Sequence, residues 1–268
     1  MENNFTKEII NQSEGMLDKA YDDIVHPIAE PVGQILSYLP RTIRLFFAKW
    51  EKWIVNGEEN LKLTGEALKD KVSGIPEEKL CEPEPYVAIP AIQQIAYCYD
   101  SDELRDMYAN LLAASMNTDK KWQVHPGYVD IIKQLTPDEA RLLRICPRSS
   151  VLYKPLINLT IKEPNNQGSR TLKRNYTNFA DDVLDCPANI GSYIDNLNRL
   201  EIIKVPGDMH IPDDSFYFPI ENSRFIKEME QKTPLKEGEQ FEHVKKLFYV
   251  TEFGLGFINC CIDDSFNN

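Results

Sequence analysis

Hydrophobic residues recur at helical spacing through the first half of the chain, most clearly over residues 39–54. At roughly 100° per residue, the apolar side chains of this segment fall within an arc of about 120°. They are Leu39, Ile43, Phe46, Phe47, Trp50, Trp53 and Ile54. Arg41, Arg44 and Lys52 fall on the opposite side. With an acidic helix expected over 5–25, this pattern predicts a region of amphipathic helices at residues 1–57.

Further helices are predicted over residues 58–146, which we expect to form a central helical domain. Its strongest local pattern is Thr136-Pro137-Asp138-Glu139. An N-cap threonine, a proline at the first helical position and a glutamate at the third together favour a helix start. Asp100 with Glu103 is a second candidate capping box. Helical periodicity covers residues 58–73, 91–99, 100–116 and 125–135, with a proline-rich linker at 76–90.

The pattern changes after residue 146. Residues 147–177 are mixed, with Pro155 inside an apolar run and a loop-like composition from 164 to 174. A predicted helix at 187–200 is then followed by strands at 202–205, 216–218 and 244–250 and by a last helix, capped by Thr251, to 262. Helix, strand, loop, strand, helix is typical of a winged-helix-like module.

These elements predict a mainly α fold, with a helical N-terminal and central region and a small α+β winged-helix-like C-terminal module. The expected domains are 1–57, 58–146, 147–262 (a basic connector and the module) and a tail at 263–268.

The net charge of the chain bears on which classes of partner it can bind. The 268 residues include 42 acids and 30 bases, for a net charge of −12. Such a balance argues against a protein that coats nucleic acid or anionic lipid with its whole surface. We expect a cytoplasmic location, because there is no run of 18 apolar residues and Met1-Glu2-Asn3-Asn4 lacks a secretory pattern. One basic stretch lies near 141–174, and its candidate phosphate contacts are Arg141, Arg144, Arg148, Arg170, Lys173 and Arg174.

Common catalytic motifs are missing from the sequence. It contains no phosphate-binding glycine loop, no G-x-S-x-G, no H-E-x-x-H and no C-x-x-C pair. Cys98, Cys260 and Cys261 are expected to be small buried hydrophobic residues. We therefore expect no enzyme activity, no catalytic residue, no metal and no cofactor.

Two segments remain as candidate interaction sites. The aromatic face of 39–54, formed by Phe46, Phe47, Trp50 and Trp53, fits either a protein partner or a membrane surface. The basic stretch could contact nucleic acid, but the helix at 187–200 carries Asp195 and a single arginine, Arg199. A helix that enters the major groove normally presents several basic or amide side chains. Protein contact is therefore favoured over nucleic acid.

Several segments carry a family resemblance, among them 75–78 and 85–96. Residues 104–116, Leu-Arg-Asp-Met-Tyr-Ala-Asn-Leu-Leu-Ala-Ala-Ser-Met, and residues 125–140, from His-Pro-Gly-Tyr through Thr-Pro-Asp-Glu-Ala, resemble the core of the Abi-alpha (abortive infection alpha) family of bacterial proteins. Residues 193–200 are also similar, although Glu201 stands where that family often has glycine. The likeness covers roughly residues 60–262. It implies a bacterial cytoplasmic protein connected with defence against phage.

Together these observations favour a non-enzymatic protein of anti-phage defence that acts through protein contacts, with another protein or with itself. A membrane-surface effector using 39–54 and a nucleic-acid-binding protein using 141–174 are the alternatives.

Overall fold

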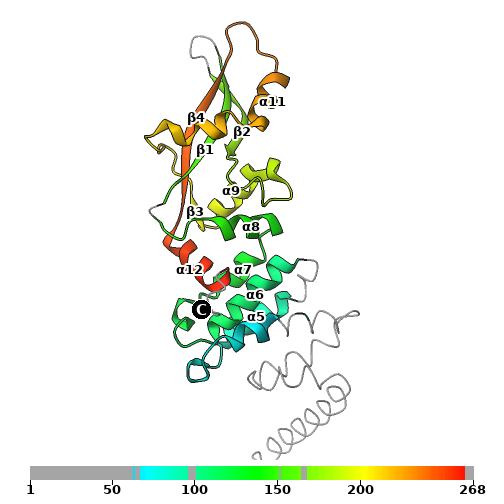
Figure 1. The fold of residues 1–268 in the computed structure, drawn as a ribbon, viewed down its shortest axis with the longest axis vertical. Coiled ribbons are helices and arrows are strands. Elements are labelled where there is room, and N and C mark those ends of the chain that lie inside the picture. Colours follow the sequence, from blue (N-terminus) through cyan, green and yellow to red (C-terminus); the bar gives the residue numbers. More distant parts are fainter. Residues whose placement is uncertain (1–62, 64–66, 96–100, 151, 164–167, 263–268) are drawn as a thin grey trace, which may run out of the picture. The chain divides into compact units, whose positions relative to one another are not determined.

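The computed structural model describes residues 63, 67–95, 101–150, 152–163 and 168–262 (Figure 1). They fall into two compact units, one containing the described residues up to Val129 and the other those from Asp130 onward. The domain boundaries predicted at 57, 146 and 262 stay predictions. The segment 39–54 lies outside the described residues.

The first unit is helical. Its regular elements are η1 (Glu77–Lys79), α5 (Pro85–Ile95), α6 (Asp102–Ser115), η2 (Lys121–Gln123) and the first residues of α7 (Gly127–Ile132). Helix α6 is the centre of this unit, since all residues from Met107 to Ser115 are buried. Its N-cap is Ser101, whose side chain accepts a hydrogen bond from the Leu104 amide. The capping box was therefore predicted one residue too early, at Asp100.

The second unit is built around a four-stranded antiparallel sheet of order β2-β1-β4-β3. Three of its strands are long and lie side by side (Figure 1). Strand β1 pairs with β4 along nine residue pairs, from Lys154 opposite Phe248 to Lys162 opposite Gln240. The strands are β1 (Lys154–Lys162), β2 (Ser169–Tyr176), β3 (Ile203–Lys204) and β4 (Gln240–Val250).

Helices and short turns surround this sheet. They are α8 (Pro137–Ile145), η4 (Pro187–Asn189), α9 (Ile190–Arg199), η5 (Asp214–Phe216), α10 (Phe218–Glu221), α11 (Arg224–Lys232) and α12 (Glu252–Cys261). Side chains on one face of β4, such as His243, meet α10 and α11. On the other face, Lys246 meets Asn175, which in turn binds Asp195 of α9.

The predicted mainly α fold is wrong. The chain is mixed α+β, because residues 154–162 and 169–176 form the long strands β1 and β2, where a basic connector and a loop were expected. The expected small winged-helix-like module is thus replaced by a larger sheet. The strand predicted at 216–218 is also wrong, since these residues belong to η5, the turn that follows it and the first residue of α10.

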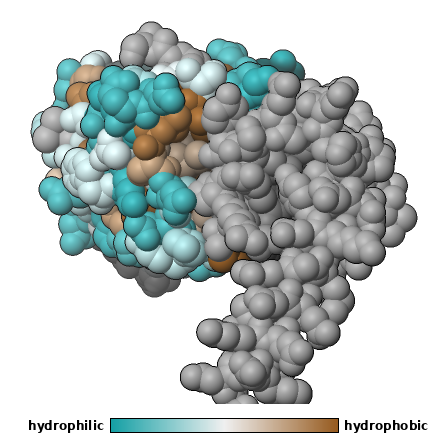
Figure 2. Space-filling model, turned by 90° about the horizontal axis from the view of Figure 1, so that it is seen from below, coloured by the Kyte–Doolittle hydropathy of each residue, from teal (hydrophilic) through white to brown (hydrophobic). Residues whose placement is uncertain are grey.

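Other predicted elements are confirmed. Thr136 caps α8 and forms a complete capping box with Glu139. Thr251 caps α12, whose Cys260 and Cys261 are buried as expected. Within the described part of the chain, no helix has both the length and the apolar character needed to cross a membrane. Among the coloured atoms on the face drawn in Figure 2, hydrophilic residues predominate and hydrophobic ones appear in a few small areas.

Candidate functional site

The six predicted phosphate contacts lie on two separate elements. Arg141 and Arg144 belong to α8 and Arg148 follows its end, whereas Arg170, Lys173 and Arg174 belong to β2. The structure therefore splits the predicted basic site into an α8 group and a β2 group.

The α8 group makes contacts within its own unit. The Arg141 guanidinium lies 2.9 Å from Asp138 Oδ1 and 2.5 Å from Asp185 Oδ2. Arg148 donates to the carbonyl oxygens of Leu143 and Arg144, both at 3.3 Å. These carbonyls belong to the last turn of α8, where a cation stabilises the helix end. Both arginines thus have a structural role.

The β2 group is also largely engaged. Arg170 contacts Glu239 Oε2 at 3.2 Å. The Lys173 ammonium donates to the Ala188 carbonyl and lies 5.5 Å from the centre of the Phe225 ring, and burial lowers its pKa. Arg174 is exposed. It is the β2 side chain best placed to meet an external anion.

A buried carboxylate, Asp138, joins α8 to the segment that leads into α9. It is 6% exposed and accepts hydrogen bonds from the amides of Asp185 and Cys186 and from the Tyr193 hydroxyl, each at 2.9 Å. Burial alone would raise the pKa of Asp138, but these hydrogen bonds, with one from Arg141, outweigh it and hold the pKa below its usual value.

Glu139 makes a second link between the same helices. Its carboxylate accepts from the Thr136 amide at 2.6 Å, which completes the capping box, and from Asn196 Nδ2 of α9 at 2.8 Å. The motif Thr136-Pro137-Asp138-Glu139 therefore both starts α8 and fixes α9 to it.

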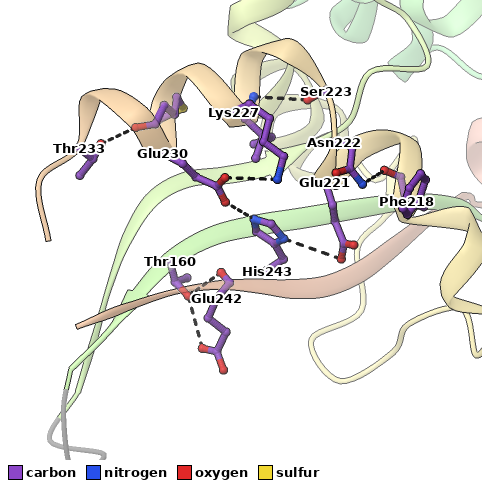
Figure 3. A network of polar contacts seen from close by, with 12 residues as sticks. Thr160, Phe218, Glu221, Asn222, Ser223, Lys227, Glu230, Thr233, Glu242 and His243 are labelled. Carbon is purple, nitrogen blue, oxygen red and sulfur yellow. Dashed lines mark hydrogen bonds and ion pairs between the residues drawn. The ribbon is translucent and has the colours of Figure 1, made fainter. Parts of the chain in front are cut away.

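A polar network of titratable side chains surrounds His243 on the sheet (Figure 3). His243 Nε2 lies 2.8 Å from Glu230 Oε1 of α11, and Nδ1 lies 4.0 Å from Glu221 Oε1 of α10. All three side chains are about one-fifth exposed, at 20%, 18% and 22%. Lys227 approaches Glu230 at 3.4 Å from within the same helix.

Lys245, two residues along the same face of β4, extends this network. Its ammonium lies 2.7 Å from Asp214 Oδ1, 3.9 Å from Glu221 Oε1 and 5.4 Å from the centre of the Tyr217 ring. The hydrogen bond to Asp214 is the main reason that the pKa of Lys245 is raised. His243 and Lys245 are thus both in contact with carboxylates from η5, α10 and α11.

This network binds secondary structure elements to one another. A histidine between two carboxylates can orient or exchange a proton. Within the described part of the chain, however, the ring nitrogens of His243 contact carboxylates and no hydroxyl or thiol nucleophile. Among the described residues, no group of three His, Cys, Asp or Glu side chains is arranged to hold a metal ion. Sequence reasoning missed these residues because Glu221, Glu230 and His243 come from three elements without a short motif.

The first unit carries an exposed tryptophan, Trp122, on η2. Its side chain is 78% exposed, and its indole N–H donates to the Asp119 carbonyl at 2.8 Å. The surrounding turn is fixed to η1 and to the segment after it, because Lys79 pairs with Asp119 at 2.7 Å and Lys121 pairs with Glu84 at 2.8 Å. The indole is therefore held by its N–H while its ring faces solvent.

Comparison with known proteins gives one result. The model of a family described as abortive infection alpha matches residues 56–261, which is most of the chain. The chain belongs to the abortive infection alpha family. This confirms the resemblance of residues 104–116 and 125–140, and the family points to anti-phage defence. No curated protein and no solved structure matches the chain.

The aromatic side chains of 39–54, Phe46, Phe47, Trp50 and Trp53, lie outside the described residues. Their assignment to a partner or a membrane surface stays a prediction.

Proposed function

We propose that this abortive infection alpha protein acts without enzymatic chemistry, through contact with another protein. The observation that carries the proposal is the position of Trp122. Large aromatic side chains dominate the binding energy of protein interfaces, and a ring already held in place loses little conformational entropy on binding. A tryptophan that is 78% exposed on a fixed turn has both properties.

The charges around Trp122 support a protein ligand. The residues just before it include an acid and a base, Asp119 and Lys121, each already paired with a residue of the opposite sign. Such neutralised pairs around an aromatic centre resemble the polar rim of a protein interface.

The nucleic-acid alternative gains little support from the contacts of the basic stretch. Arg141, Arg148, Arg170 and Lys173 all contact acids or carbonyl groups of their own unit. Binding phosphate with them would require those contacts to break.

The test is protection against phage in cells that express the full chain. Trp122→Ala should abolish protection while the purified variant melts like the wild type, because truncating a central tryptophan typically weakens binding by about thirtyfold or more. Phe218→Ala is the control, since it removes a ring that is 66% exposed in the other unit. Protection unchanged by Trp122→Ala would refute this interface. Nuclease, NADase or nucleotidyl-transfer activity that is lost on a single carboxylate change would refute the non-enzymatic role.

A further inference from the structure

One edge of the central sheet lacks a neighbouring strand. All nine residues of β4 from Gln240 to Phe248 pair with β1, but β3 pairs only with Tyr249 and Val250. Strand β3 ends at Lys204, and Pro206 soon afterwards has no amide hydrogen with which to continue a ladder. Within the described part of the chain, most of β4 is therefore paired on one side only. Unpaired strand edges are templates for a further strand.

The open edge presents both apolar and charged groups. Val244, in the middle of the strand, is 39% exposed. Glu242 lies two residues before it and Lys246 two residues after it, so these three side chains share one face of the sheet. An antiparallel second copy of this segment would place its base opposite the acid, its apolar residue opposite the apolar residue and its acid opposite the base.

We propose that β4 pairs with β4 of a second copy of this chain, antiparallel and centred on Val244, which would extend the sheet across a two-fold axis. In an antiparallel pair, two residues that face one another have their side chains on the same face of the sheet. Because side chains alternate along a strand, the residue at the two-fold axis must face the same residue of the other copy. Centring on Val244 places the two Val244 side chains together and places Glu242 of each copy opposite Lys246 of the other. Opposite charges at facing positions stabilise antiparallel pairs.

Neighbouring registers are less favourable. Centring on Glu242 would place two carboxylates opposite one another, and centring on Lys245 or on Lys246 would do the same with two ammonium groups. Centring on His243 would place Glu242 opposite Val244, without a charge partner. Among the registers centred on residues 242 to 246, only the Val244-centred one places a glutamate of β4 opposite a lysine, while His243 of each copy faces Lys245 of the other.

The environment of Lys246 also favours an incoming carboxylate. Its ammonium lies 3.4 Å from Asn175 Oδ1. Burial lowers its pKa most, and the nearby Arg174 lowers it further, with only Asp195 acting in the opposite direction. Glu242, by contrast, is 43% exposed and lies 3.9 Å from Lys162. A carboxylate from the second copy would stabilise the two cations that β2 and β4 bring together.

The test measures the molar mass of the full chain by sedimentation over a range of concentrations. The wild type should form a dimer. Glu242→Lys should raise the dimer dissociation constant by about tenfold, because two symmetric attractive pairs become repulsive. Adding Lys246→Glu to that variant should restore dimerisation to within about threefold of the wild type. Lys133→Glu, at an exposed position outside the sheet, is the control for a charge change and should have no effect.

A second measurement covers the case in which the double variant fails to fold. Val244→Cys should form a disulfide between two copies on mild oxidation, because the same position faces itself across the axis. Gln240→Cys, which faces Phe248 in this register, should not. A wild type that stays monomeric, or a dimer that is indifferent to Glu242→Lys and gives no Val244→Cys disulfide, would overturn the proposal. Since none of these changes involves Trp122, their failure leaves the protection assay to decide the proposed function separately.

Discussion

The Tyr193 hydroxyl of α9 donates a 2.9 Å hydrogen bond to Oδ2 of Asp138, the second residue of α8. With the amides of Asp185 and Cys186, it surrounds a buried carboxylate with donors. The same environment acts on the tyrosine, because burial and the hydrogen bond to Asp138 raise the pKa of Tyr193 to about 12. This pair holds α8 and α9 together.

Replacing the carboxylate should therefore be costly. We expect Asp138→Asn to lower the free energy of unfolding by about 3 kcal/mol, because an amide cannot accept from all of these donors and at least one buried donor loses its partner. Urea denaturation at pH 7 measures the loss. Asp185→Asn is the control: its side chain is 76% exposed and contacts Arg141, so its loss should be below about 1 kcal/mol.

The stability should also depend on pH through Asp138. Its pKa is lower in the folded protein than the usual value of about 3.9 in an unfolded chain. Such a group contributes stability above its unfolded pKa, and that contribution is lost as the pH falls through the folded pKa. The difference in urea midpoint between wild type and Asp138→Asn should shrink when the pH is lowered from 5 to 3. A constant difference would contradict this.

Gly254, near the start of α12, should not tolerate a side chain. A Cβ at this position would lie 1.9 Å from the backbone oxygen of Ile202. Since neither backbone can move easily, Gly254→Ala should lower the free energy of unfolding by roughly 3 kcal/mol. At Gly207 a Cβ meets nothing within 4 Å, so Gly207→Ala should leave stability unchanged or raise it by up to about 1 kcal/mol. Thermal melting compares the two variants.

Glu201 has a backbone conformation that favours glycine. Its φ is 57°, in the left-handed region, and its side chain pairs with Lys204 at 3.0 Å. Glycine adopts this φ without steric cost, so the substitution should add about 1 kcal/mol to the free energy of unfolding. This exceeds what an exposed ion pair usually contributes. Glu201→Gly should therefore raise the melting temperature. Glu201→Ala, which removes the ion pair but keeps the strain, should lower it slightly.

The His243 network should hold α10 and α11 against β4. His243→Ala removes the 2.8 Å contact with Glu230 and should lower the free energy of unfolding by about 1–2 kcal/mol. Hydrogen exchange should rise in α10 and α11 more than in β1. Lys227→Ala, which removes a weaker 3.4 Å contact with the same carboxylate, is the control and should change exchange less.

Elements with local patterns could be predicted from the sequence, whereas β1 could not. The caps at Thr136 and Thr251 depend on residues three positions apart, so the sequence contains the whole pattern. Strand β1 has buried residues on both faces, among them Leu156 and Ile157 at 0% exposure. A strand buried on both sides lacks the alternation by which strands are recognised, and Pro155 obscured it further.

The candidate sites could likewise be predicted only as far as their residues are close together in the sequence. The sequence identified basic residues near 141–174, but only the structure shows that Asp185 and Glu239, distant along the chain, pair with Arg141 and Arg170. Nor does any spacing predict that Glu221, Glu230 and His243 meet. Trp122 could have been singled out only by its exposure, which depends on the folded chain.

The absence of a side chain at Gly254 has a mechanical consequence. The first turn of α12 rests directly on Ile202, the residue that leads into β3, where Thr251 also donates to the carbonyl oxygens of Glu201 and Ile202. Because no side chain separates them, the backbone of α12 is in direct contact with the backbone that leads into β3, and the two segments are rigidly connected. We therefore expect β3 and the first turn of α12 to move together when either one is displaced.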